Sequence, residues 1–195
     1  MATAPEHAAP AETPFTAGPD RRTGVRSYAV PFIVAVTGHR DLVSDEIPIL
    51  RSRVRDCLFS LRYEYPSRII VVMSSLADGA DRLVAEEALQ LGMPLSVVLP
   101  MPRVLYEEDF TPESLEQFAE LCGKAAEIFE LPLLPGATPR SIAESGPNRT
   151  RQYAQLGVFL SAHCHVLLAL WDGKESDLLG GTAATIQFHH HDVMP

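Results

Sequence analysis

Short, uninterrupted apolar runs recur along this chain, spaced so that a helix fits between each run and the next. The runs are rich in valine, isoleucine and leucine and are bounded by glycine, proline or polar residues, which is typical of buried strands in a parallel sheet. They occupy residues 32–36, 69–73, 95–99, 128–131 and 166–171. The pattern predicts five strands, of which the fourth is the shortest.

The segments between the runs repeat their apolar residues every three or four positions, which is the spacing of one helix face. The clearest starts near Ser44, and further helices are predicted at residues 82–91, 112–124, about 148–160 and 182–188. Thr111 and Pro112 suit the N-cap and first turn of the third helix. Alternating strands and helices predict an α/β fold: a Rossmann-like, doubly wound, mostly parallel sheet flanked by helices, with right-handed crossovers.

Other parts of the chain lack any such period. Residues 1–27 are rich in alanine, proline, threonine and glutamate and are predicted to form a disordered N-terminal tail, because they offer too little apolar surface to offset the entropy of ordering. Residues 28–195 are predicted to form a single domain. The proline- and glycine-rich residues 133–147 are predicted to be a long, mobile connection. The chain stops soon after its last helix, which fits a fragment of a longer protein.

Composition narrows the function classes. A formal net charge of −9 argues against an extended nucleic-acid-binding surface, so nucleic acid is an unlikely partner. The three cysteines are widely separated and form no Cys-x-x-Cys pair, and the N-terminus lacks a secretory signal pattern. A reduced, cytoplasmic setting is therefore predicted.

Polar residues gather where the first strand ends. Gly38, His39 and Arg40 follow it directly, and the carboxyl ends of strands border the ligand crevice of an open α/β sheet. Glycine lets a ligand approach the backbone, and the arginine fork matches a phosphate. The alternative is that Arg40 pairs locally while His39 packs.

A second polar loop, residues 74–81, follows the second strand with the sequence Ser-Ser-Leu-Ala-Asp-Gly-Ala-Asp. Its two aspartates, Asp78 and Asp81, suit capping of the next helix. Ser74, Ser75 and the N–H groups around Gly79 are a candidate anion or ribose site. No Gly-x-Ser-x-Gly elbow surrounds Ser74, so it is not predicted to be a nucleophile.

The last strand leads through Asp172 and a polar loop to Gly180-Gly181-Thr182, a tight helix start. Free N–H groups and the helix dipole at such a start favour a phosphate or a carboxylate. Earlier in the chain, Arg149 and Arg151 stand at a helix start against the preference of the dipole. They are expected either to bind phosphate or to form salt bridges with the acidic residues 107–109.

Two further clusters of polar residues are interpreted as structural. The carboxylates of residues 107–109 precede a helix and are expected to be solvated partners of its dipole rather than an acid–base pair. Residues 189–191 are three consecutive histidines. Consecutive helical positions point in different directions, so these side chains are not predicted to converge on a metal ion.

Taken together, four of these motifs resemble the SLOG superfamily, which includes the Lonely Guy phosphoribohydrolases and the DprA/Smf proteins. They are Val36-Thr37-Gly38-His39-Arg40, the loop of residues 74–81, Asn148-Arg149 and Gly180-Gly181-Thr182, and the resemblance extends over roughly residues 30–193. The second motif looks like the Ser-Gly-Leu-Ala-x-Gly-Ile-Asp loop of DprA-type proteins, with Ser75 in place of the glycine and Ala80 in place of the isoleucine. A Gly-x-Gly-x-x-Gly fingerprint and a Walker loop are both missing, so dehydrogenases and P-loop enzymes match poorly.

The resemblance implies a nucleotide or nucleotide-derived ligand whose phosphate is held by the loops at Gly38 and Gly180. It also implies homodimers and, in some relatives, a sensor role in bacterial signalling or defence, often joined to an effector or membrane region absent from this chain. The hydrolase branch carries Pro-Gly-Gly-x-Gly-Thr-x-x-Glu, and Thr185 stands here where that glutamate would lie. The expected carboxylate partner of an oxocarbenium-type transition state is thus missing.

The leading hypothesis is therefore a nucleotide-sensing domain with no catalytic residue, no cofactor and no metal. A phosphoribohydrolase acting on nucleoside 5′-monophosphates is the first alternative, and single-stranded DNA binding in the DprA manner is the second. The candidate ligand-binding residues are Gly38, His39, Arg40, Ser74, Ser75, Gly79, Arg149, Asp172, Gly180, Gly181 and Thr182.

Overall fold

The computed structural model describes residues 30–176 and 178–191, and its five strands form one all-parallel sheet in the order β4-β3-β2-β1-β5. The α/β, Rossmann-like prediction is confirmed. The tail predicted at residues 1–27 lies outside the described residues. The strands are β1 (Phe32–Gly38), β2 (Ile70–Ser74), β3 (Leu95–Leu99), β4 (Glu127–Glu130) and β5 (Val166–Leu170).

The five longer helices begin and end close to their predicted positions. They are α1 (Ile47–Glu64), α2 (Ala80–Gln90), α4 (Pro112–Lys124), α6 (Pro147–Ala162) and α7 (Thr182–His191). The shorter helices α3 (Arg103–Tyr106) and α5 (Pro139–Ala143), and the 3-10 turns η1 (Ser44–Glu46) and η2 (Glu107–Asp109), were not predicted.

The connection predicted at residues 133–147 contains the helix α5. Its N-cap residue Thr138 and Ser141 form a reciprocal capping box, and Ile142 is fully buried. A capping box satisfies two backbone N–H groups that would otherwise lack partners. One buried apolar side chain and this cap are therefore enough to order the short helix where sequence composition alone indicates a loop.

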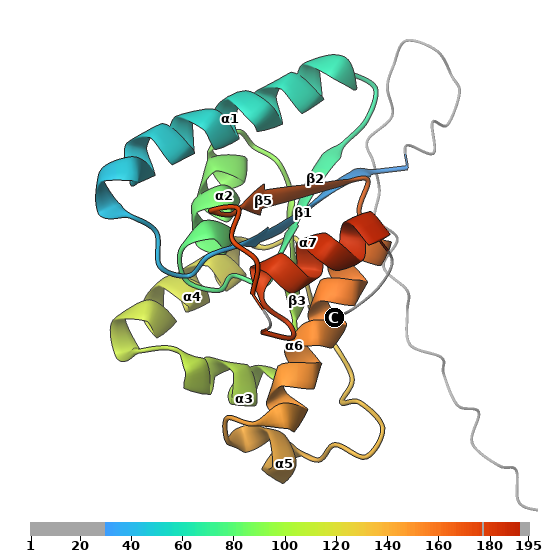
Figure 1. The fold of residues 1–195 in the computed structure, drawn as a ribbon. Helices are drawn as coiled ribbons and strands as arrows, with labels where there is room; N and C mark the ends of the chain where they lie inside the picture. Colours follow the sequence, from blue (N-terminus) through green and yellow to red (C-terminus); the bar gives the residue numbers. More distant parts are fainter. Residues whose placement is uncertain (1–29, 177, 192–195) are drawn as a thin grey trace, which may run out of the picture.

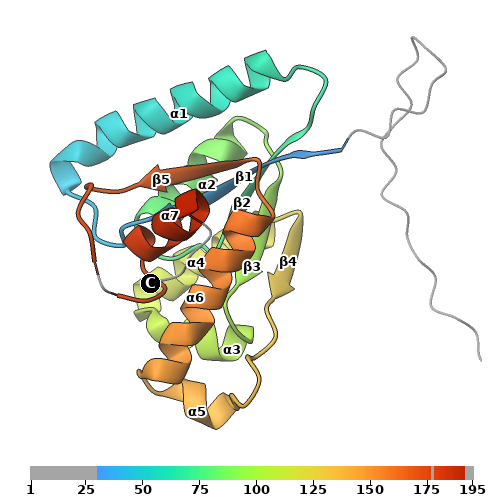
Figure 2. The ribbon, with the colours of Figure 1, turned by 45° about the vertical axis from the view of Figure 1, so that its right-hand side comes forward.

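Helices cover both faces of the sheet (Figures 1 and 2). On one face α1, α2 and α4 bury Leu58, Val84 and Phe118 against the larger apolar core. On the other face α6 places Leu156 and Leu160 over β1, β2 and β3 in a second, smaller core. The chain thus runs outward from β1 to β4 with its helices on one face and then returns across the other face to β5, as right-handed crossovers require.

The strand order reverses at β1, which pairs with β2 on one side and β5 on the other. Ala35 of β1 lies opposite Met73 of β2 and Leu167 of β5, and Gly38 lies opposite Leu170. The carboxyl ends of β1 and β5 are therefore adjacent. In open α/β sheets, ligands bind outside the carboxyl ends of the strands at such a reversal point.

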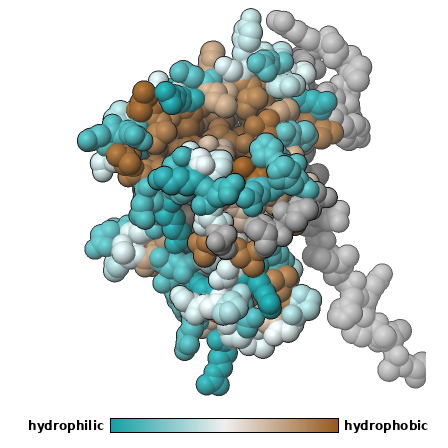
Figure 3. All heavy atoms as spheres, viewed as in Figure 1, coloured by the Kyte–Doolittle hydropathy of each residue, from teal (hydrophilic) through white to brown (hydrophobic). Residues whose placement is uncertain are grey.

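The strand β5 forms one edge of the sheet and is only partly covered. Val166, Leu167 and Leu168 are half-buried and Ala169 is exposed. In Figure 3, apolar atoms gather beneath α1, in the region where Figure 1 draws β5. β5, which lies beside the reversal point, is thus also one of the two edge strands of the described sheet.

The N-cap predicted for α4 is confirmed, and it supports a stability prediction. The hydroxyl of Thr111 accepts a hydrogen bond from the N–H of Ser114 at 3.3 Å. We expect Thr111→Ala to lower the free energy of unfolding by about 1 kcal/mol, measured by urea denaturation. Thr111→Ser keeps the acceptor oxygen and serves as the control, so an equal loss in both variants would contradict a capping role.

Candidate functional site

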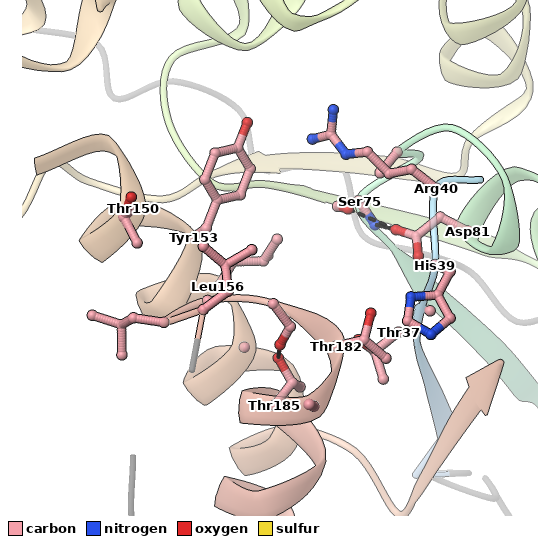
Figure 4. A pocket seen from close by; sticks show the side chains of 18 of the residues that line it. Thr37, His39, Arg40, Ser75, Asp81, Thr150, Tyr153, Leu156, Thr182 and Thr185 are labelled. Carbon is pink, nitrogen blue, oxygen red and sulfur yellow. Dashed lines mark hydrogen bonds between the residues drawn. The ribbon is translucent and has the colours of Figure 1, made fainter. Parts of the chain in front are cut away.

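A cleft of about 490 Å³ opens at the carboxyl ends of β1, β2 and β5. The loops after these strands form one side, and α6 together with the first turn of α7 forms the other. Figure 4 shows Thr150 and Tyr153 of α6 across the open space from Arg40 and Ser75. Cavities of roughly 300–1,000 Å³ are usual for small ligands, and this one lies beside the reversal point of the sheet.

Gly38 ends β1 in a position where no side chain fits. A Cβ atom there would lie 2.3 Å from the Cβ of Ala80 and 2.8 Å from the carbonyl oxygen of Leu170. The glycine therefore lets β5 and the start of α2 approach the strand end closely. This packing brings the loops that border the cleft together.

Gly79 holds the same loop from the other side. Its φ angle is +76°, and a Cβ atom would lie only 2.1 Å from the carbonyl oxygen of Arg40. The next N–H, that of Ala80, donates to the carbonyl of His39 at 3.0 Å. Gly79 does not itself line the cleft. The backbone of His39 and Arg40 packs directly against Gly79.

Ser75 and Asp81 meet at the bottom of the cleft. The hydroxyl and the N–H of Ser75 both donate to Oδ2 of Asp81, at 2.6 and 3.2 Å (Figure 4). Burial raises the pKa of Asp81, while these hydrogen bonds act in the opposite direction. Ser74 is fully buried behind the cleft, where its hydroxyl accepts from the N–H of Leu76 at 3.1 Å.

The capping role expected for Asp78 and Asp81 is wrong. The N-cap of α2 is Gly79, which makes no side-chain cap hydrogen bond. Asp78 instead forms an ion pair with the buried Arg82 at 2.8 Å. Asp81 turns inward to the Ser75 loop, because its backbone position already lies inside the first helical turn.

Arg149 forms the salt bridge to residues 107–109 that was the second of its two predicted roles. Its side chain is buried, and its guanidinium donates to Oδ1 of Asp109 at 2.7 Å and to the carbonyl oxygens of Leu105 and Ile142 at 2.9 and 2.6 Å. Asp109 also contacts the hydroxyl of Tyr153. Arg149 lines the cleft, yet its hydrogen-bonding groups mainly tie α3, α5 and α6 together.

Arg40 differs from Arg149 in both exposure and pairing. Its side chain is 41% exposed, and the nearest carboxylate oxygen found for it, Oδ2 of Asp109, is 3.7 Å away. Its guanidinium carbon lies 5.9 Å from the ring centre of Tyr153. This is its one ion pair among residues 30–176 and 178–191, and an ion pair at this distance and exposure is weak, so the guanidinium can donate to an anion in the cleft.

The first turn of α7 borders the cleft opposite the loop after β1. Gly180 has a φ angle of +80°, and a Cβ atom there would lie 2.7 Å from the backbone nitrogen of Ala154, so glycine lets this turn approach α6. The first N–H groups of α7 have no partner within their own helix. They point to the side of Gly181 and Thr182, which line the cleft, and no hydrogen bond from them to another described residue is found.

Thr185 lies where the resemblance to the hydrolases predicts a glutamate, and its hydroxyl is hydrogen-bonded within its own helix. It is buried, and its hydroxyl donates to the carbonyl oxygen of Gly181 at 3.1 Å. Gly157 of α6 packs directly against it, since a Cβ atom there would lie 2.6 Å from the Thr185 oxygen. A neutral hydroxyl held in this way does not replace a carboxylate in stabilising positive charge.

His39 and Asp172 fasten the two strand-end loops to each other. Nε2 of His39 lies 3.1 Å from Oδ1 of Asp172, and Oδ2 of Asp172 lies 2.8 Å from the ammonium of Lys174. Lys174, followed by His39, holds the pKa of Asp172 well below its usual range. Asp172 therefore shapes the loop after β5 rather than lining the cleft.

Most of the predicted ligand-binding residues are brought together in the cleft. Those that line it are Gly38, His39, Arg40, Ser75, Arg149, Gly180, Gly181 and Thr182. Ser74, Gly79 and Asp172 do not line it but hold the loops that do.

Other residues line the cleft that were not singled out as ligand contacts from the sequence, among them Thr37, Asp81, Tyr153 and Trp171. Tyr153 lies one helical turn beyond Arg149, so the four-residue spacing placed both on one face. Thr37 and Trp171 each follow a core residue at the end of a strand, and strand alternation turns them to the opposite face. Both signals were present in the sequence.

The comparison with solved structures supports the fold. The structure is similar to that of DNA processing protein A (DprA) from Streptococcus pneumoniae, with a TM-score of 0.55 and 17% sequence identity. The alignment covers 83% of this chain and 48% of DprA, so the chain matches about half the length of that protein. No family model and no curated protein matches the sequence. The likeness therefore supports a DprA-like, Rossmann-like fold.

Two features are absent from the described residues. Within residues 30–176 and 178–191, no group of three or more His, Cys, Asp or Glu side chains is arranged to hold a metal ion. In the same ranges, no helix combines the length and the apolar character needed to cross a bilayer.

Proposed function

We propose that the cleft binds a nucleotide or nucleotide-derived ligand through its phosphate and that this chain acts as a ligand-sensing domain. The observation that carries the proposal is the environment of Arg40, an exposed cation whose one ion pair among the described residues is 3.7 Å long, in the same cleft as the first turns of α6 and α7. A guanidinium together with free helix N–H groups is a strong combination for phosphate.

The chemistry of the cleft favours binding over catalysis. Thr185 replaces the hydrolase carboxylate, and Asp109 is engaged by Arg149 and Tyr153. Asp81 is held by Ser75. Thr185 has no carboxylate, and the carboxylates of Asp109 and Asp81 are both already hydrogen-bonded within the protein. A role in bacterial signalling or defence, and a homodimer with an effector elsewhere, stay predictions from the resemblance.

The test is calorimetric titration of the chain with AMP, ADP-ribose and cyclic dinucleotides, compared with adenosine, which lacks phosphate. We expect a phosphate-dependent affinity, weakened roughly ten- to a hundredfold by Arg40→Ala, because a hydrogen bond to a charged group contributes about 1.5–3 kcal/mol. Arg53→Ala is the matched control, since Arg53 is exposed on α1. It removes the same charge from the chain at a distance from the cleft.

Two outcomes would contradict this function. The proposed phosphate site is wrong if no compound of the panel binds more tightly than millimolar, or if the wild-type and Arg40→Ala chains have equal affinities. Release of free adenine from AMP would instead support the phosphoribohydrolase alternative. A salt-dependent affinity for single-stranded DNA exceeding that for every nucleotide would favour DNA binding, which only the resemblance and the fold of DprA support.

A further inference from the structure

Trp171 is an aromatic residue that lines the cleft but has no role in the proposed phosphate site. It follows β5 directly, and its neighbour Leu170 packs into the core shared with α1 and α2. Successive strand residues point to opposite faces, so Trp171 turns to the side of α6 and α7, where it lines the cleft. It is the only tryptophan of the chain, and 37% of it is exposed.

The indole ring of Trp171 is fixed in place by its own loop. Its N–H donates to the carbonyl oxygen of Lys174 at 2.9 Å. That loop is in turn held by Asp172, which accepts from the N–H of Lys174 at 3.1 Å and pairs with its ammonium. The polar atom of the indole is therefore satisfied within the protein, and the exposed part is an apolar aromatic face.

Tyr153, a half-buried aromatic ring of the cleft, is less free for a ligand. Its hydroxyl contacts Asp109, and its ring lies under the guanidinium of Arg40. The cleft thus combines a cationic side at Arg40 with an aromatic surface at Trp171. A ligand that uses both carries an anionic group and a flat, apolar group.

We propose that Trp171 binds the nucleobase of the ligand by stacking, so that the cleft selects nucleotides over sugar phosphates. The inference rests on the proposed function, which supplies the phosphate site, and adds the residue that recognises the rest of the ligand. Every base presents a flat face, so stacking alone tolerates different bases. Because the ring is already fixed, its ordering costs little on binding.

The test compares AMP with ribose 5-phosphate, which carries the same phosphate and sugar without the base. Calorimetry is expected to show that the wild-type chain binds AMP roughly ten- to a hundredfold more tightly, in line with alanine substitutions at stacked bases. In Trp171→Ala this ratio is expected to fall towards one, and Trp171→Phe is expected to restore most of it. Tyr63→Ala, which removes an aromatic ring 80% exposed on α1, is the control and leaves the ratio unchanged.

Intrinsic fluorescence provides a second readout, because all of the tryptophan signal comes from Trp171. AMP is expected to quench it and ribose 5-phosphate to leave it nearly unchanged. Equal wild-type affinities for the two compounds, both lowered by Arg40→Ala, would overturn the stacking role while the phosphate site stands. An unchanged ratio in Trp171→Ala would also overturn it. If no nucleotide of the panel binds, the proposed function fails and the stacking role fails with it. If another nucleotide binds and AMP does not, the same ratio is measured with that nucleotide and its base-free counterpart.

Discussion

Replacing Gly79 by alanine is expected to lower the free energy of unfolding by about 2–5 kcal/mol, because a strained backbone and an overpacked contact each cost about 1–3 kcal/mol. At φ +76° and ψ −115° the backbone has a conformation that side chains with a Cβ rarely adopt. The new methyl group would also lie 2.1 Å from the carbonyl oxygen of Arg40. That oxygen belongs to the backbone, so the loop itself has to move.

The same substitution is expected to weaken phosphate binding. The loop that moves carries Arg40, and the N–H of Ala80 holds it through the carbonyl of His39. Moving the guanidinium by about an ångström is enough to spoil a hydrogen bond, whose length varies little between sites. Gly79 thus couples the stability of the fold to the geometry of the cleft, although it does not touch the cleft.

Gly92→Ala is the matched control for Gly79→Ala. Gly92 also has a positive φ angle, +70°, but a Cβ atom there meets nothing within 4 Å. It is expected to cost only the backbone term, about 1–2 kcal/mol, and to leave AMP affinity unchanged. Denaturation in urea, followed by circular dichroism, measures both losses. Similar losses in the two variants would show that the contact with Arg40 contributes nothing.

The sheet and the longer helices could be predicted because their signals are local. Most strands are rich in consecutive apolar residues, and the run of residues 95–99 coincides with β3 as observed. The exposed edge strand β4, with the sequence Glu-Ile-Phe-Glu, has the weakest such signal. The N-cap of α4 could also be predicted, because Thr111 directly precedes a proline. The short helices α3 and α5 escaped prediction because four or five residues do not establish a helical period.

The cleft could be predicted only as far as the strand ends define it. Gly38, Arg40 and Gly181 follow strands or open a helix, so the topology alone brought them together. The individual partners of Arg149 and Asp81 were less predictable. A salt bridge from Arg149 to residues 107–109 was one of two expectations, but Asp109 lies 40 residues from Arg149 in the sequence, and which of the three acidic residues Arg149 meets depends on how α3 and α6 pack.

The resemblance to the SLOG superfamily added what neither local pattern nor topology provides. It suggested a nucleotide ligand and drew attention to the position of Thr185. The observed hydrogen bond from Thr185 to Gly181 gives that position a structural role within α7. Trp171, in contrast, belongs to none of the resembling motifs, and only its placement in the cleft points to a ligand contact.

A second large effect is expected where α1 meets α2, at the buried carboxylate of Glu87. Its side chain is only 1% exposed, and it pairs with Arg51 at 2.9 Å and Arg55 at 2.7 Å. Replacing both arginines by methionine is expected to lower the free energy of unfolding by about 3–5 kcal/mol, because it leaves a buried charge without a partner. Guanidinium chloride denaturation measures the loss.

Adding Glu87→Met to the double variant distinguishes two causes of the loss: the missing ion pairs with the arginines and the unpaired buried charge of Glu87. If the stranded charge dominates, the triple variant is expected to regain most of the stability, since apolar side chains of similar volume often replace a buried ion pair without loss. Arg51 also pairs with Glu86 at 2.5 Å, and that half-exposed contact is lost in both variants. A triple variant as unstable as the double one would mean that the arginines stabilise the α1–α2 contact by their own packing, independently of the charge on Glu87.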